Sequence, residues 1–496
     1  MTDDKSSRPK ARVPRGFRDR GAEEIAAERA SLDSIRRVFE SWGFDALETP
    51  SFEFTDALGK FLPDLDRPNE GVFSLQDDDG QWLSLRYDLT APLARYVAEN
   101  FQSLPKPFRR YQVGQVWRNE KPGPGRYREF MQFDADTVGS ASPAADAELL
   151  MMTCDTLEAL GLKRDEFVIK LGNRKLLDGV LESCGLSLAD QKRRGTVLRA
   201  IDKLDRLGLD GVRALLGAGR LDESGDYTGG AGLSHDQSMR VLKFVTEVPE
   251  TGDKDGLARL WNRIAPEQSY DSVGADGARE LDRIIGLIRS CGHDGHIRFD
   301  PGIVRGLDYY TGAVFEAQLT FPVASDEGEP AQSGSVAGGG RYDNLVARFT
   351  GERVPATGIS IGVSRLLNAL KSRSAAALPP LVLVLALDKD ERAASFALAA
   401  ELRAAGLRAE TYAGDSGMKA QLRYADRRGA AIAVIEGADE RARGEVTLKD
   451  LVLGAELSKS VESRADWVKD RPAQFSVPRA DFVARVREML GRKESR

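Results

Sequence analysis

The segment that decides the fold reads Tyr111-Gln-Val-Gly-Gln-Val-Trp-Arg118-Asn-Glu120, then Lys-Pro-Gly-Pro-Gly, then Arg126-Tyr-Arg-Glu-Phe130-Met-Gln132-Phe-Asp134-Ala-Asp136. Alternating β-branched and aromatic residues flank the Pro/Gly loop, which predicts two antiparallel strands joined by a tight connection. Side chains alternate faces along a strand. Two sets of residues therefore each share one face: Arg118 and Glu120 on the first strand, and Arg126, Arg128, Phe130, Gln132, Asp134 and Asp136 on the second.

The mixture of residue types on this hairpin indicates chemistry rather than packing. Guanidinium groups suit phosphate, an aromatic ring suits a base, and carboxylates suit a cationic or hydrogen-bond-donating ligand. The alternative is a solvated amphipathic hairpin with incidental charges. That alternative explains the arginines but not Phe130 among them, so we expect a nucleotide-activating site.

Several motifs together resemble one enzyme family. The spacing Arg-x-Glu, loop, Arg-x-x-x-Phe-x-x-x-Asp resembles motif 2 of the class II aminoacyl-tRNA synthetases. Two further segments resemble the signature peptides of histidyl-tRNA synthetases: Arg305-Gly-Leu-Asp-Tyr309-Tyr310-Thr-Gly312 and Ala337-Gly-Gly-Gly-Arg341-Tyr342-Asp343. Four more segments resemble, in turn, the family's N-terminal opening, motif 1, amino-acid site and motif 3: Pro14–Asp19, Glu23–Glu53, Leu85–Thr90 and Gly358–Leu366 with its Arg365.

The resemblance implies an α+β fold. It consists of a class II antiparallel-sheet catalytic domain with a helical insertion, followed by a C-terminal α/β anticodon-binding domain. Leucines, lysines and arginines recur at helical spacing within the insertion, without a strand signal. The apolar run Leu381–Leu387 predicts a parallel strand buried on both faces. We expect these segments: 1–20, flexible tail; 21–175, catalytic domain with motifs 1 and 2; 176–290, helical insertion; 291–372, catalytic domain with the histidyl signature and motif 3; 373–380, linker; 381–496, anticodon-binding domain.

The resemblance also implies how ATP is bound as a substrate. Arg118 would hold the α-phosphate, while Arg126 and Arg365 would hold the terminal phosphates. Phe130 would stack on adenine, and Glu120 would accept a hydrogen bond from its amino group. Mg²⁺ would bridge the phosphates.

Histidine would occupy the neighbouring pocket. The two catalytic candidates are Arg305 and Arg118. Arg305 would bind both the substrate carboxylate and the α-phosphate. The remaining residues are assigned by resemblance: Asp88, Thr90 and Gln132 to the α-ammonium, Asp136 and Tyr310 to the imidazole, and Tyr309 and Tyr342 to the pocket wall. Many bacterial members carry Glu at the positions of Asp88 and Asp136. The paired shortening resembles the eukaryotic-type branch.

Composition agrees with a large enzyme inside the cell. A chain of 496 residues exceeds one hydrophobic core, so about two to four domains are expected. No apolar run approaches the ~20 residues of a membrane span. Three widely separated cysteines favour reduced thiols, hence a cytoplasmic location. The net charge of −6 does not exclude RNA, because binding depends on local basic patches.

Histidines are too few to suggest histidine-based catalysis. Only His235, His293 and His296 occur, and the spacing Cys291-Gly-His293-Asp-Gly-His296 hints at a metal site. A fourth ligand is not evident, and the glycines favour a turn. We therefore predict an exposed loop without a metal, and assign the chemistry to arginines and magnesium.

The sequence predicts a histidine–tRNA ligase whose partners are tRNA(His), histidine, ATP and a second copy of the chain through motif 1. Three alternatives remain open at this stage. One is a catalytically silent paralogue serving as a regulatory subunit in histidine biosynthesis. The others are a synthetase-like sensor of uncharged tRNA and a synthetase for a different amino acid.

We predict that the connecting loop does not read the acceptor end of tRNA through its side chains. Common bacterial histidyl enzymes place a glutamine and a basic residue there, against an extra guanosine at the tRNA 5′ end. The matching residues are Gly123 and Pro124, which have no side-chain donors and cannot supply the ~1–3 kcal/mol of a bidentate base contact. Charging kinetics should be comparable for transcripts with and without that nucleotide. A loss of about a hundredfold, or about 2.7 kcal/mol, would contradict this.

Overall fold

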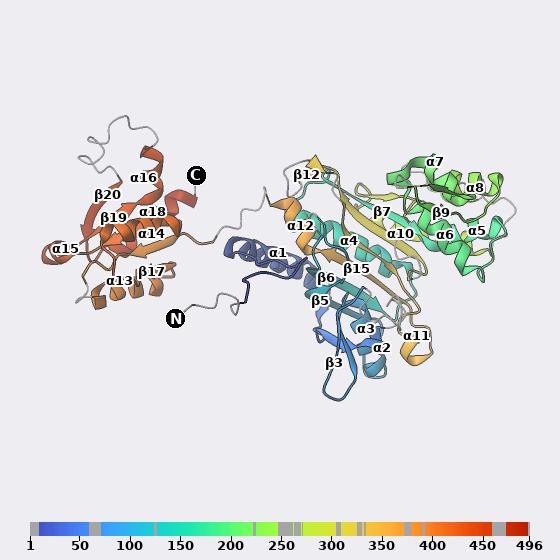
Figure 1. Cartoon of the computed structure of the whole chain (residues 1–496), viewed down its shortest axis with the longest axis horizontal. Helices are drawn as coiled ribbons and strands as arrows, with labels where there is room; N and C mark the ends of the chain where they lie inside the picture. Colours follow the sequence, from blue (N-terminus) through green and yellow to red (C-terminus); the bar gives the residue numbers. More distant parts are fainter. Residues whose placement is uncertain are drawn as a thin grey trace, which may run out of the picture. The chain divides into compact units, whose positions relative to one another are not determined.

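The computed structural model describes residues 9–58, 71–123, 126–221, 225–246, 261, 269, 271–303, 309–324, 330–331, 334–371, 378–388, 392–458 and 473–494. The chain divides into two compact units, Met1–Ala376 and Ala377–Arg496, each of which is considered by itself (Figure 1).

An eight-stranded sheet organises the described part of the first unit. Its order is β1 (Asp45–Ala46), β5 (Phe108–Trp117), β6 (Glu129–Val138), β15 (Ala356–Gly362), β14 (Ser335–Arg341), β11 (Ala313–Leu319), β7 (Phe167–Asn173) and β10 (Ile297–Phe299). Pairing is antiparallel from β5 through β7 and parallel at the two edges. The predicted α+β class and the predicted antiparallel hairpin β5–β6 are confirmed. Strand β5 ends earlier than predicted and β6 begins later. Arg118, Glu120 and Arg126 therefore lie in the connection between them.

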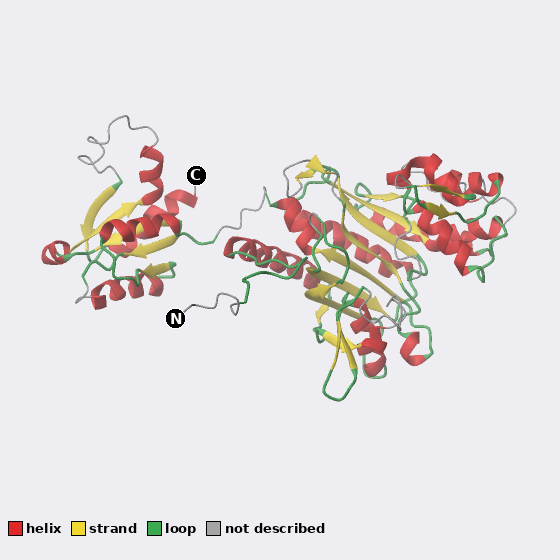
Figure 2. Cartoon of the chain, viewed as in Figure 1, coloured by secondary structure: helices red, strands yellow, loops and turns green. Residues whose placement is uncertain are grey.

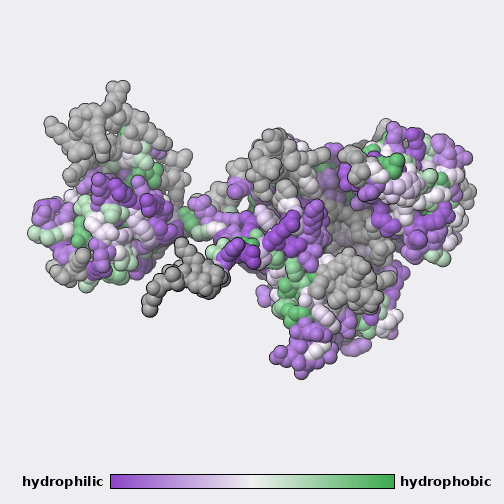
Figure 3. All heavy atoms as spheres, in the orientation of Figure 1, coloured by the Kyte–Doolittle hydropathy of each residue, from purple (hydrophilic) through white to green (hydrophobic). Residues whose placement is uncertain are grey.

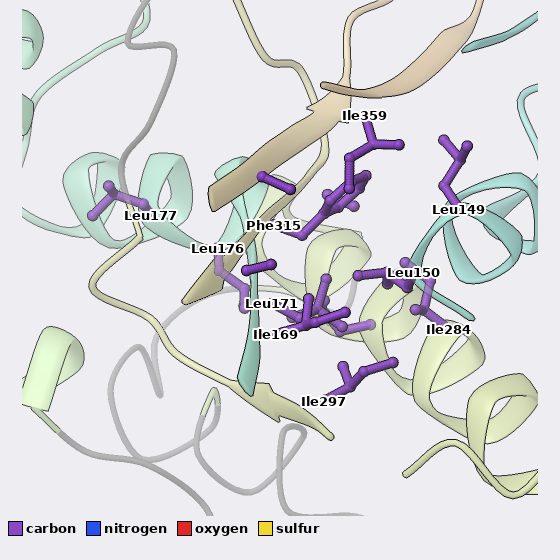
Figure 4. Close-up of a cluster of buried hydrophobic side chains, with 14 of the residues drawn as sticks. Leu149, Leu150, Ile169, Leu171, Leu176, Leu177, Ile284, Ile297, Phe315 and Ile359 are labelled. Atoms are coloured by element: carbon purple, nitrogen blue, oxygen red, sulfur yellow. The ribbon is translucent and has the colours of Figure 1, made fainter. Parts of the chain in front are cut away.

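One face of this sheet carries the apolar core. Alternate residues of β6 and β15, such as Phe133 and Ile359, join Ile169, Leu171 and Phe315 in one buried cluster (Figure 4). Four helices cover this face: α1 (Ala22–Ser41), α4 (Pro143–Ala159), α10 (Val273–Ser290) and α12 (Val363–Leu370) (Figure 2). Helix α4 begins with Pro at its first position, and the Ser142 side chain accepts from the Ala144 amide, a favourable helix start.

The opposite side of the sheet carries smaller elements. A three-stranded sheet is formed by β2 (Phe52–Phe54), β4 (Trp82–Leu85) and β3 (Ser74–Gln76), and beside it lie α2 (Thr55–Leu58), α3 (Thr90–Asn100) and α11 (Ala347–Thr350). Leu93 and Val97 of α3 pack in one cluster with Tyr342. A short hairpin of β12 (Val323–Ala324) and β13 (Pro330–Ala331) completes the strands of this unit outside the insertion.

The N-terminal segment is packed rather than free from about Pro14 onward. The Gly16 carbonyl accepts from the Arg128 amide at 2.8 Å, and Phe17 contacts Phe73 with ring centroids 5.9 Å apart. Gly16 has φ 86 and lies against the Arg128 side chain, a conformation and a close approach that suit glycine. This corrects the expectation of a flexible tail over the last residues of 1–20, because the motif 2 connection gives them a binding surface.

The insertion contains α5 (Arg174–Ser183), α6 (Gln191–Ile201), α7 (Leu204–Leu216) and α8 (His235–Thr246). It also contains a hairpin of β8 (Gly219–Leu221) and β9 (Tyr227–Gly229). The expectation that this segment lacks strands is therefore wrong. Its three-residue strands are rich in glycine and too short to produce an alternating pattern.

The second unit has a five-stranded sheet in the order β17 (Ala409–Thr411), β16 (Leu381–Val384), β18 (Ala430–Ile435), β19 (Glu445–Asp450) and β20 (Gln474–Pro478). Its helices are α13 (Arg392–Ala404), α14 (Met418–Arg427), α15 (Ala438–Arg443), α16 (Leu451–Ser458) and α18 (Phe482–Glu494). The first three strands are parallel, as predicted, but β19 and β20 are antiparallel. The expected parallel sheet is thus a mixed one, because two consecutive strands form an antiparallel edge.

Candidate functional site

The candidate site lies on the face of the large sheet that points away from the core. Strand register aligns Arg110 of β5 with Asp136 of β6, Asp136 with Gly358 of β15, and Gly358 with Gly340 of β14. The row of partners beside it contains Gln112, Asp134 and Ser360. Polar side chains and glycines therefore form the floor of the site across four strands.

The glycines of this floor leave room for the side chains that cover it. A Cβ added at Gly358 would lie 1.8 Å from Asp136 Oδ1, and one at Gly340 would lie 2.8 Å from the Tyr310 ring. A Cβ at Gly114 would lie 2.4 Å from an Arg86 nitrogen. Real Cβ atoms essentially never come within 3.0 Å of such neighbours, so a side chain at any of the three positions would force the neighbouring group to shift.

Asp136 is held from two directions. The Tyr342 hydroxyl donates to Oδ1, and Arg110 Nη2 lies 2.8 Å from Oδ2 in an ion pair. Burial raises the pKa of Asp136, while the Arg110 charge opposes that rise. The structure thus places the residue predicted to face the imidazole at the centre of a buried charge cluster.

Asp134 also has a raised pKa. Burial raises its pKa to about 8, and the neighbouring Asp136 charge adds to the effect. Its Oδ1 has no hydrogen-bond partner among the described residues, and neither has Gln132 Oε1. The Gln132 amide donates to Ser360 Oγ at 2.5 Å. This face of the sheet therefore carries buried oxygen atoms that the described residues leave without a hydrogen bond.

Asp88 has a structural role that the motif did not reveal. Its Oδ1 accepts from the backbone amides of Thr90 at 3.2 Å and Ala91 at 2.9 Å, which caps the start of α3. Burial raises its pKa. Asp88 Oδ1 is thus engaged by the backbone of α3, and Oδ2 is the atom that would accept from the α-ammonium group of a substrate.

Three aromatic rings form a wall beside these carboxyls. Tyr309 stacks on Tyr342 with centroids 5.2 Å apart and meets Tyr310 edge-on at 5.1 Å. Burial raises the pKa of both Tyr309 and Tyr342, so their hydroxyls stay protonated. The predicted histidine-binding residues among the described ones thus gather on the same face of the sheet.

The predicted ATP residues lie around the motif 2 connection. The Arg118 guanidinium is 5.1 Å from the centroid of the Phe130 ring, and its Nε donates to the Tyr87 carbonyl at 3.2 Å. Glu120 pairs with Arg126 at 2.6 Å in an exposed contact. A nucleotide bound as predicted would therefore contact both Glu120 and Arg126, and the ion pair between them would have to open or to accommodate the nucleotide.

Arg365 and Arg305 are the two remaining arginines predicted to bind substrate. Arg365 of α12 donates to the Ser335 carbonyl at 2.7 Å, which joins motif 3 to β14. Arg305 lies outside the described residues. Sequence reasoning missed Arg110 and Arg86, two buried arginines of the site. Arg110 directly precedes a predicted strand, and Arg86 lies within the Leu85–Thr90 segment that resembles the amino-acid site.

The Cys291–His296 segment has local carboxylate partners. His293 Nε2 lies 3.0 Å from Asp155 Oδ1, and His296 Nε2 lies 3.5 Å from Glu158 Oε1. His296 is buried and stacks on Phe167, so the expectation of an exposed loop is wrong for this residue. Within the described chain, no group of three or more His, Cys, Asp or Glu side chains could hold a metal ion.

Comparison with known proteins decides the family. The family model for histidyl-tRNA synthetase matches residues 16–366, and that for an anticodon binding domain matches residues 381–489. The chain belongs to the histidyl-tRNA synthetase family. A histidine–tRNA ligase of Methylocella silvestris is 56% identical over 505 residues, covering 99% of this chain and 100% of the relative. The family predicted from the sequence is thus confirmed.

Solved structures agree with this fold. A histidyl-tRNA synthetase from Nostoc sp. matches with a TM-score of 0.71 and 29% identity, over 97% of this chain and 100% of the neighbour. A Bacillus halodurans protein described as an ATP phosphoribosyltransferase regulatory subunit/histidyl-tRNA synthetase matches with a TM-score of 0.66 and 23% identity, over 84% and 97%. The second likeness concerns the fold alone, so fold does not separate a synthetase from a regulatory paralogue.

We predict that Gly358→Ala abolishes most histidine-dependent ATP–pyrophosphate exchange. The added methyl group would occupy the place of Asp136 Oδ1 and displace a carboxylate of the pocket. The matched control is Gly286→Ala in α10, where a Cβ meets open space. Alanine there should leave exchange unchanged and stabilise the helix by up to ~1 kcal/mol. Exchange by Gly358→Ala within about twofold of the control would show that the glycine row does not shape the site.

Proposed function

We propose that this chain is a histidine–tRNA ligase, which activates histidine with ATP to histidyl-adenylate and transfers it to the 3′ end of tRNA(His). The observation that carries the proposal is the buried floor, where Asp136 and Asp134 offer acceptors and Tyr342 fixes one of them. The 56% identity to a histidine–tRNA ligase over nearly the whole chain supports this activity over the regulatory-subunit alternative.

ATP would bind across the motif 2 connection. Attack of a carboxylate on the α-phosphorus brings two anions together, and preorganised cations lower that barrier. Arg118 would bind the α-phosphate, and Arg126 and Arg365 the terminal phosphates. Phe130 would stack on the adenine, and Glu120 would accept from its amino group, once the contact of Glu120 with Arg126 gives way.

Histidine would lie on the glycine floor. Its ammonium would contact Asp88, Thr90 and Gln132, and Arg305 would bind its carboxylate together with the α-phosphate. A neutral imidazole has one donor and one acceptor nitrogen. Asp136 would accept from the donor, and the Tyr310 hydroxyl would donate to the acceptor.

Magnesium would arrive with ATP. The phosphate oxygens of the nucleotide would be its ligands. When bound, the ion would neutralise phosphate charge.

The tRNA would be read in part by the second unit, whose match to an anticodon binding domain spans residues 381–489. We also propose a cytoplasmic location. Cys154, Cys184 and Cys291, all of them described, form no disulfide, as suits a reducing compartment. In the described residues, no helix is long and apolar enough to cross a membrane.

We propose that the chain works as a homodimer. Phe52 and Phe54 are 44% and 53% exposed on one face of the small sheet, while Glu53 between them is buried and pairs with Arg95. Leu75 is also exposed there, and Figure 3 shows hydrophobic surface gathered over this sheet. A soluble monomer rarely leaves such a patch open, and a second copy would cover it symmetrically. Light scattering should give twice the 54.2 kDa of one chain; a monomer at working concentration would contradict this.

We predict that Arg305→Ala lowers histidine-dependent ATP–pyrophosphate exchange by about 100- to 1000-fold, the usual effect of removing one charge-stabilising donor at a reacting centre. The matched control is Arg298→Ala, whose side chain is exposed on β10 and should leave exchange unchanged. Circular dichroism checks that both variants fold. A folded Arg305→Ala enzyme with near-normal exchange would remove this arginine from the mechanism.

A further inference from the structure

Strand β5 carries, at its third residue, an arginine that is fully buried. Arg110 Nη2 donates to the Leu89 carbonyl at 3.0 Å and lies 2.8 Å from Asp136 Oδ2. Its Nε and Nη1 have no hydrogen-bond partner in the part of the chain that the structure describes. A buried guanidinium is costly unless it is paired, so apolar packing alone does not account for Arg110 at this position.

Several carboxyl groups surround this arginine. Among the described residues, the charged and titratable groups around Asp136 are Arg110 on β5, Asp134 on β6, Asp88 before α3, and Tyr309 and Tyr342 of the aromatic wall, and Arg86 acts in turn on Asp134 and Arg110. Burial raises the pKa of Asp134 and Asp136, and the Arg110 charge is the largest influence in the opposite direction for both. Without Arg110, these two carboxyls would take up protons more readily.

The protonation state of Asp136 decides what it can recognise. An ionised carboxylate only accepts hydrogen bonds, whereas a protonated carboxyl presents an O–H. The N–H of a neutral imidazole needs an acceptor. A protonated Asp136 would therefore lose part of its complementarity to histidine.

We propose that Arg110 is a positioning residue for histidine selection, which keeps the Asp136 carboxylate charged and directed toward the imidazole of the substrate. The inference rests on the proposed function. Arg110 acts through Asp136, because the guanidinium lies on the same face of the sheet in contact with that carboxylate and with the Leu89 carbonyl. The Arg110 charge acts on Asp88, Asp134 and Asp136. We infer that it keeps carboxylate oxygens of the site able to accept from the ammonium and N–H groups of an amino acid such as histidine.

The experiment measures ATP–pyrophosphate exchange from pH 5.5 to 9 for the wild type, Arg110→Met and Arg110→Lys. Methionine fills a similar volume without charge, and lysine keeps the charge without the planar fork. In Arg110→Met we expect the KM for histidine to rise about tenfold or more while the KM for ATP stays within about twofold. The acid limb of kcat/KM for histidine should move to higher pH, because a more basic Asp136 must lose its proton before histidine binds. In Arg110→Lys that limb should stay near its wild-type position.

A matched control separates this role from general stability. Arg194 is another buried arginine paired with an aspartate, Asp178, in the helical insertion. Arg194→Met should lower the melting temperature without moving the acid limb. If Arg110→Met does not fold, Arg110→Gln, which keeps a donor for the Leu89 carbonyl, must show the same limb shift.

The outcomes are distinct. An acid limb unchanged in the uncharged variant, or KM values for histidine and ATP that rise together, would overturn the role of Arg110 while leaving the proposed function intact. Absence of histidine-dependent exchange in the wild type would instead overturn the proposed function.

Discussion

The site depends on one constraint, which is the placement of charge on one face of a sheet whose other face is the apolar core. Along β6, Phe133 and Ala135 enter that core, while Gln132, Asp134 and Asp136 face the site. A register slip of one residue would exchange the two sets, so the core that stabilises the fold also fixes the carboxyls. Buried carboxyls need compensating groups, which Arg110 and Tyr342 supply in part and which a substrate with N–H groups would complete.

Glycine makes this arrangement sterically possible. Gly340 and Gly358 are neighbours on adjacent strands. The Tyr310 ring occupies the space where a side chain of residue 340 would lie, and the Asp136 carboxylate occupies that of residue 358. Glycine weakens strands in general, yet here the surrounding strands and the helices α4 and α10 hold the sheet. Because packing on the core face stabilises the sheet, the site face can carry glycines that contribute little packing of their own.

Much of this could be predicted from the sequence, because alternation and motif spacing are local signals. The β5–β6 hairpin and the shared face of Gln132, Asp134 and Asp136 follow from period-two patterning. Arg110 could not be recognised, because an arginine in a strand normally indicates an exposed position, whereas this one is buried and contacts the distant Leu89 carbonyl. The antiparallel edge formed by β19 and β20 was missed for a related reason, since strand direction is set by pairing rather than by composition.

The central claim is that the buried floor selects histidine for activation. ATP–pyrophosphate exchange by the wild-type enzyme, measured separately with each of the twenty amino acids, tests it most directly. The account predicts exchange with histidine at least about 10⁴-fold above that with other amino acids, as expected where buried polar groups must all find partners. Comparable exchange with another amino acid, or none with any, would contradict it.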